Sequence, residues 1–159
     1  EDQALARSIG FGAVKYADLS HDPATAIDFN WDKALALEGN SGPYLQYAHA
    51  RVCSLMDKAG NPDVSKFSYS IASPSEKLLA LQLLKFGDTV RKAAGNHKPS
   101  LLADYLFQTA QLYSSFYQRS PVLKAEAEVR DARIRLCALF GKVLAEGLRI
   151  LGIETPRRI

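Results

Sequence analysis

The sequence predicts an all-α protein built as an antiparallel helical bundle. Apolar residues recur at helical spacing along almost the whole chain of 159 residues. Helix-capping signals precede several of these segments, and glycine or proline separates them. This length fits one domain, or one domain with an attached segment, and 47% hydrophobic residues suffice for a core.

The first forty residues predict one helix, a loop and a short helix. Residues 3–18 carry apolar side chains at helical spacing. Residues 20–30 are expected to form a loop, and the alternation over 27–30 is compatible with a short extended piece. Residues 31–37 predict a short helix that ends at Gly39.

A stronger helix is predicted from about residue 40 to residue 59. Asn40 or Ser41 can cap its first turn, and Pro43 suits a position where no N–H partner is needed. Gly60 follows the last turn, where a left-handed backbone is common.

Residues 73–76, Ser-Pro-Ser-Glu, form a capping box that predicts the start of the next helix. That helix is apolar around most of its circumference, so we expect it in the middle of the bundle. Gly87-Asp88 is expected to break or recap it. Two long helices follow, over 99–118 and about 125–151, and Ser120-Pro121 stops the first of them.

Composition excludes some classes and leaves the partner open. No apolar run approaches the ~20 residues of a membrane span, and the first residues do not resemble a signal peptide. The net charge of +3 is unevenly distributed. Residues 1–40 hold seven acidic and three basic side chains, whereas residues 119–159 hold five acidic and nine basic ones. The basic C-terminal part suits phosphate contact, and a solvated helix face explains it equally well.

No catalytic motif is present. The chain has no phosphate-binding loop or nucleophile elbow, and Gly10-Phe11-Gly12 lies in a helical pattern without a preceding strand. Cys53 and Cys137 are expected to be buried reduced thiols. The three histidines are not at metal-ligand spacing, so a metal site is not expected.

Two groups of residues remain as candidates for binding. Arg130 and Arg133 lie one helical turn apart and could hold phosphates, or could form an ordinary solvated face. Tyr113, Phe116 and Tyr117 form one aromatic stripe, which could stack on unpaired RNA bases or belong to the core.

Four stretches, in order along nearly the whole chain, resemble bacterial-type arginyl-tRNA synthetases. They are GAVKYADLS at 12–20, EGNSGPYLQYAHAR at 38–51, SSFY with PVLKAE at 114–126, and the last segment at 147–159. The resemblance implies a class I enzyme whose full-length form joins arginine to tRNA(Arg) with ATP and Mg²⁺. The catalytic signatures of that family are absent from this chain, so no catalytic residue, cofactor or metal is expected in it.

The resemblance also implies a division of the chain. Residues 1–39 are similar to the end of the catalytic region and its connecting segment, and residues 40–159 to the helical DALR-type anticodon-binding domain. Arg133 falls in the family's A-x-R-L-like helix pattern, and Ile159 stands where the family commonly ends in methionine near the anticodon loop. The residues expected to contact tRNA are Arg51, Tyr113, Phe116, Tyr117, Arg130, Arg133 and Ile159.

The expected partners are tRNA(Arg) and the catalytic domain of the same protein, in the cytoplasm, with no role for DNA or a membrane. A different class of function stays open. The chain could be a helical protein-interaction module derived from a synthetase, in which case a bare apolar patch without a basic rim is expected.

Overall fold

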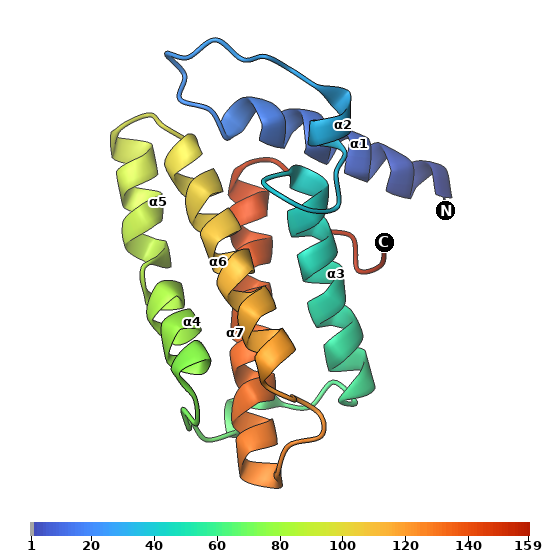
Figure 1. Ribbon diagram of the computed structural model, residues 1–159, viewed down its shortest axis with the longest axis vertical. Helices are drawn as coiled ribbons and strands as arrows, with labels where there is room; N and C mark the ends of the chain where they lie inside the picture. The colour runs from blue at the N-terminus through green and yellow to red at the C-terminus, as the bar shows by residue number, and fades with distance from the viewer. Residues whose placement is uncertain (1) are drawn as a thin grey trace.

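A computed structural model describes residues 2–159, and all regular structure in that range is helical (Figure 1). The prediction of an all-α fold is therefore confirmed. The elements are α1 (Asp2–Leu19), α2 (Trp31–Ala34), α3 (Gly42–Lys58), η1 (Val64–Lys66), α4 (Pro74–Leu84), α5 (Phe86–Gly95), α6 (Ser100–Arg119) and α7 (Ala127–Ile150).

The helices from α3 to α7 form an antiparallel bundle, and α1 lies across one end of it (Figure 1). α4 and α5 follow one another in the same direction, α6 returns, and α7 reverses again. α7 packs against α3, α4 and α6, and α1 packs mainly against α3. No helix in residues 2–159 is long and apolar enough to cross a membrane.

The predicted capping residues act as expected. Ser41 Oγ accepts a hydrogen bond from the Tyr44 amide at 3.1 Å, and Ser73 Oγ accepts one from the Glu76 amide at 3.3 Å. Each bond satisfies an amide that has no partner within its own helix. Gly60 has a φ of +79° just beyond α3, which explains why glycine follows this helix.

The position of α4 differs from the prediction. This helix lies at the edge of the bundle, and its outward side leaves Leu78, Leu81 and Leu84 exposed, the last at 79%. The centre is occupied by the longer α6 and α7, so α4 buries only one side, through Leu79 and Leu83. A helix that is apolar all round was expected to be surrounded, and this expectation is wrong here.

Two boundaries also differ from the prediction. The break after α4 falls at Lys85 rather than at Gly87-Asp88, which lie inside α5. The short helix after the first loop ends at Ala34 instead of reaching residue 37. Both shifts are within the usual uncertainty of helix ends read from sequence.

α1 is held closely against the start of α3. A Cβ on Gly42 would lie 2.5 Å from the carbonyl oxygen of Gly12, so the two backbones meet where neither residue has a side chain. The buried Tyr16 hydroxyl donates to Asn40 Oδ1 at 2.7 Å and lies 3.1 Å from the Ala103 carbonyl oxygen. These contacts fix the angle at which α1 crosses the bundle end.

Candidate functional site

A groove lies between α3, from Tyr47 onward, and the last residues of the chain. It has a volume of about 690 Å³. Its lining consists of Tyr47, Ala50, Arg51, Ser54, Asp57, Lys58, Arg157, Arg158 and Ile159. Four of these side chains are basic and one is acidic, so the groove favours an anionic ligand.

α3 places its groove residues on one face because of their spacing. Tyr47, Arg51 and Lys58 are separated by four and seven residues, which is one and two turns of an α-helix. The opposite face of α3 carries Leu45 and Val52, which are buried in the core. A packed helix therefore presents the ligand-facing side chains from a rigid support.

Two tyrosines border the Arg51 guanidinium. Its central carbon lies 5.0 Å from the ring centroid of Tyr117 on α6 and 5.9 Å from that of Tyr47. Both rings are more than one-third exposed. Half-exposed aromatic rings next to a guanidinium are the surfaces on which unpaired bases stack in RNA-binding proteins.

The C-terminal tail, residues 154–159, forms the other wall of the groove. The Arg157 guanidinium lies 3.1 Å from the Asp57 carboxylate of α3. The side chain of Gln46 donates to the Glu154 carbonyl oxygen at 2.8 Å. Ile153, just before the tail, is buried, whereas Ile159 is partly exposed at the groove. The tail is thus tied to α3 at residues 154 and 157.

Tyr113 and Phe116 do not reach the groove. They are 1% and 0% exposed, and the Tyr113 ring stacks on Phe140 with centroids 4.0 Å apart. A base cannot stack on rings that the core already covers on all sides. The expectation that these two residues contact tRNA is therefore corrected: of the stripe, Tyr117 alone is exposed.

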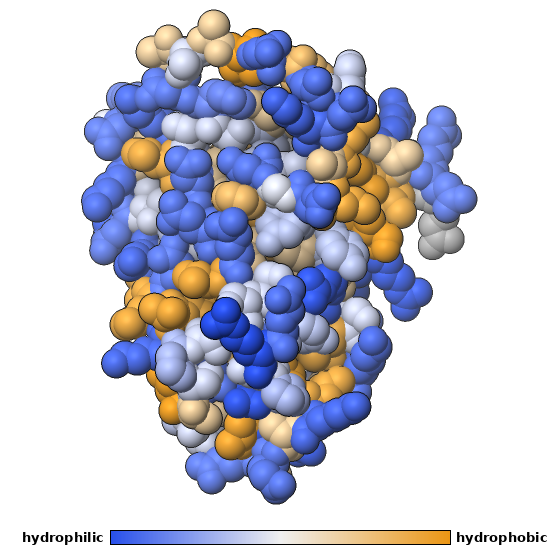
Figure 2. Space-filling model, in the orientation of Figure 1, coloured by the Kyte–Doolittle hydropathy of each residue, from blue (hydrophilic) through white to orange (hydrophobic). Residues whose placement is uncertain are grey.

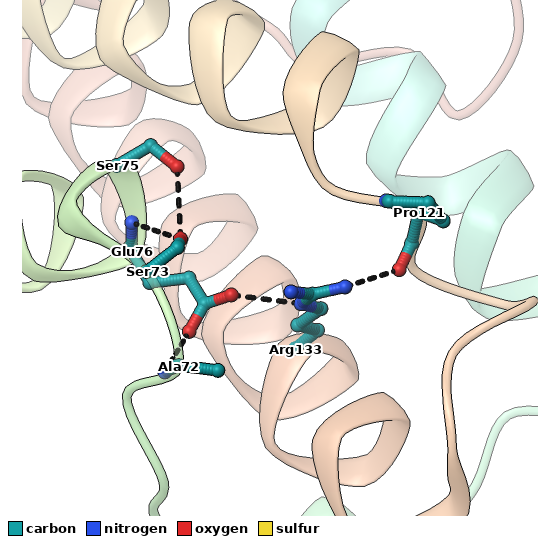
Figure 3. A network of polar contacts seen from close by, with 6 residues as sticks. All are labelled: Ala72, Ser73, Ser75, Glu76, Pro121 and Arg133. Carbon is teal, nitrogen blue, oxygen red and sulfur yellow. Dashed lines mark hydrogen bonds and ion pairs between the residues drawn. The ribbon is translucent and has the colours of Figure 1, made fainter.

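Arg133 lies between Glu76 and Pro121 (Figure 3), and its side chain is mostly shielded from solvent. Its Nε donates to Glu76 at 2.7 Å and its guanidinium donates to the Pro121 carbonyl oxygen at 2.7 Å. The side chains of Arg133 and Glu76 are 12% and 2% exposed. Glu76 also accepts from the Ala72 amide at 2.6 Å, so this pair joins α7 to the start of α4.

This arrangement corrects the expected role of Arg133. The one-turn spacing from Arg130 predicts a shared solvent-facing surface, for phosphate or for water, but the Arg133 side chain turns toward α4. Arg130 remains accessible, pairs with Asp131 at 3.1 Å, and lines a separate hollow of about 380 Å³ with Phe67 and Leu123. The hollow shares Lys58 with the groove.

The sequence indicated Arg51 and Ile159, which line the groove, and Tyr117, which lies beside Arg51, but not the other lining residues. Tyr47 and Lys58 share the helix face of Arg51, so helical spacing alone could have identified them. Arg157 reaches the groove because the tail folds back along α3, where Arg157 pairs with Asp57, 100 positions earlier in the sequence. No local pattern in the sequence indicates that return.

The cysteines and histidines form no metal-binding cluster within residues 2–159. Cys137 is buried and Cys53 is half-buried, both as free thiols. Burial raises the pKa of Cys53, and raises the pKa of Cys137 to about 12, so both thiols stay protonated near neutral pH. Cys53 was expected to be buried and is instead partly accessible beside His49, 3.8 Å away.

Comparisons with known proteins agree with these features. The family model described as the DALR anticodon binding domain matches residues 45–159. Arginine–tRNA ligase of Cellvibrio japonicus is 45% identical over 158 residues, covering 98% of this chain and 27% of that protein. The corresponding protein of Thermobifida fusca is likewise 45% identical, with the same coverage.

Solved structures show the same arrangement. The arginyl-tRNA synthetase of Thermus thermophilus superposes with a TM-score of 0.91 at 37% identity, covering 100% of this chain and 28% of that one. The chain therefore spans little more than a quarter of the length of the relatives it matches. Because the family model covers most of the chain, the protein belongs to the DALR anticodon-binding domain family.

Proposed function

We propose that this chain is the tRNA-binding part of an arginine–tRNA ligase, and that the groove beside the C-terminal tail holds unpaired bases of the anticodon loop of tRNA(Arg). The groove carries the proposal because four basic side chains and the partly exposed Tyr47 line it, and the partly exposed Tyr117 lies beside its Arg51. Guanidinium and ammonium groups bind phosphates, while aromatic rings hold splayed-out bases. The names of the relatives support arginine as the amino acid.

The chemistry of the full-length enzyme would lie outside this chain. We propose that the parent protein joins arginine to tRNA(Arg) with ATP and Mg²⁺ in the cytoplasm, and that this part supplies binding and selection. Residues 1–39 then connect the catalytic region to the helical domain formed by residues 40–159. DNA and membranes have no place in this proposal.

Exposed apolar side chains near the first two helices support a contact with the catalytic domain. Phe11 is 61% exposed and Trp31 is 59% exposed, and Phe29 packs edge-on against Trp31 with centroids 4.8 Å apart. Figure 2 shows apolar residues gathered beside the N-terminal part of α1. Such surface is costly in water and suits a domain interface.

A salt series tests the proposed function. The purified chain is titrated with tRNA(Arg) and with a non-cognate tRNA at several salt concentrations. Binding that prefers tRNA(Arg) and weakens with salt, with a log–log slope of roughly −2 to −3 for three or four phosphate contacts, supports the proposal. Equal and weak binding of both RNAs contradicts it for this chain.

One observation favours a second function, a protein-interaction module. The ridge of Leu78, Leu81 and Leu84 on α4 is exposed and lies on a different helix from the groove. Replacing these leucines by glutamine separates the two functions, because it should remove a protein contact and leave tRNA binding unchanged.

A further inference from the structure

The amide of Gln46 lies where three segments meet. Gln46 is fully buried near the start of α3. Its Nε2 donates to the Ser8 carbonyl oxygen of α1 at 3.1 Å and to the Glu154 carbonyl oxygen of the C-terminal tail at 2.8 Å. Both partners are acceptors, so the amide nitrogen must face them.

The fold makes room for this amide at a glycine. A Cβ on Gly12 would lie 2.7 Å from Gln46 Nε2, so α1 approaches the amide where it has no side chain. One donor bond of the Gln46 amide is made to α1 and the other to the tail, so the amide bridges the two segments. A small displacement of α1 would lengthen the bond to Ser8 and disturb the one that holds Glu154.

A second contact joins the same helix to the same end of the chain. Lys15 Nζ donates to the Gly152 carbonyl oxygen at 2.5 Å. Gly152 has a φ of +71° and turns the chain from α7 into the tail. α1 thus holds the turn directly through Lys15, and two residues later it reaches the tail indirectly, through the bond from Gln46 of α3 to Ser8.

The tail carries a third of the groove lining. Beyond Glu154 it runs along α3, where Arg157 pairs with Asp57, and it places Arg157, Arg158 and Ile159 at the groove. Two of the four basic side chains of the groove, Arg157 and Arg158, thus come from the tail, and the other two come from α3. The position of the tail therefore decides whether Arg157 and Arg158 face a bound ligand.

We propose that Gln46 and Lys15 are positioning residues that couple α1 to the groove by holding the C-terminal tail, a role that rests on the proposed function of the groove. Neither side chain lines the groove. α1 belongs to the segment that precedes the matched DALR region. Through this coupling, a contact that α1 makes with another domain changes the affinity of the groove for RNA. By thermodynamic linkage, RNA binding changes the free energy of that contact by the same amount.

The test compares RNA affinity with the mobility of the tail. Lys15→Met removes one contact and leaves the core intact, and Gln46→Leu removes both amide bonds at similar volume. Each is measured in the full 159-residue chain and in a chain ending at residue 156, with an anticodon stem-loop of tRNA(Arg) as the probe. Hydrogen exchange of residues 153–159 reports the tail directly. Arg7→Met is the matched control, since it removes a charge from exposed α1 surface.

The coupling predicts a conditional effect. Lys15→Met should weaken binding about three-fold in the full chain, as expected for loss of one hydrogen bond, and speed exchange in the tail. The same change should have no effect on affinity in the chain ending at 156. Arg7→Met should change neither the hydrogen exchange of the tail nor the RNA affinity of either chain. Gln46→Leu should act in the same way as Lys15→Met and more strongly.

Two outcomes overturn the coupling. Affinity that stays unchanged while tail exchange rises shows that tail position does not matter for RNA. An equal loss in the full and shortened chains shows that the effect does not pass through the tail. If the unmodified chain binds no RNA, the proposed function fails instead, and tail exchange in Lys15→Met still decides whether α1 holds the tail.

Discussion

Arg51 on α3 and Tyr117 on α6 meet at one edge of the basic groove, with the guanidinium carbon 5.0 Å from the ring centroid. The contact brings together a cation and an aromatic ring from segments 66 positions apart in the sequence. Neither group is buried by the other, and the Tyr117 ring also lies against buried Tyr113, with centroids 5.8 Å apart. The pair offers a ligand a charge and a flat surface at fixed positions.

Arg51→Met should weaken RNA binding with little effect on folding. The change removes a phosphate-binding charge and the guanidinium plane beside two tyrosines, which is worth roughly 1–2 kcal/mol, or about 5- to 30-fold in Kd. Titration with tRNA(Arg) and a thermal melt measure the two quantities. Arg91→Met on α5 is the control, since Arg91 pairs with Asp88 on the surface. An equal loss in both variants would show a general charge effect.

Tyr117→Ala and Tyr113→Ala should separate binding from folding. Tyr117 is partly exposed, so its loss should cost ~1–3 kcal/mol of RNA binding and leave the fold in place. Tyr113 stacks on Phe140 in the core, so its loss should cost ~3–5 kcal/mol of stability. Urea unfolding and RNA titration measure both. If Tyr117→Ala unfolds the chain, Tyr117 belongs to the core and leaves the proposed site.

Arg133→Ala should destabilise the fold by ~3–5 kcal/mol, because it leaves the carboxylate of Glu76 buried without its cation. This outcome differs from the small effect expected for an exposed arginine. Arg133→Met with Glu76→Met should recover much of the loss, since it removes both charges together. Urea unfolding of the two single variants and the double variant gives the comparison. A single variant as stable as the original chain would rule out this role.

Acid should lower the stability of the fold through His49, which is largely buried. Burial is the main cause that lowers the pKa of His49 below its usual value of 6.5, and Arg157 adds to it, while the Pro156 carbonyl opposes it. The unfolded chain therefore binds a proton more readily than the folded one, so this contribution to stability is full above about pH 6.5 and is lost as pH falls below it. His49→Gln should remove that part of the decline. Melts from pH 7.5 to 5 measure it, and identical pH profiles for the two chains would exclude His49 as the cause.

Much of the fold could be predicted because its signals are local. Ser41 and Ser73 cap α3 and α4 as their sequence contexts indicate, and helical spacing predicts α6 and α7. The edge position of α4 could not be predicted, because hydrophobicity around a helix does not say which longer helices take the centre.

The site was less predictable than the fold. Spacing showed that Tyr113, Phe116 and Tyr117 share a stripe, but which member reaches the surface depends on where Phe140 packs. Arg133 pairs with Glu76, which lies 57 residues away in the sequence. The capping box explains why a glutamate stands at position 76, but it does not indicate that an arginine of α7 binds it. The tail that completes the groove returns through long-range contacts such as that between Gln46 and Glu154.

The central claim is that the groove reads bases of the anticodon loop, and a two-by-two titration tests it most directly. The original chain and Arg51→Met are each titrated with tRNA(Arg) and with the same tRNA carrying replaced anticodon bases. We predict that base replacement weakens binding of the original chain by tenfold or more, about 1.4 kcal/mol, and weakens Arg51→Met much less. Equal binding of the two RNAs by the original chain would contradict the claim.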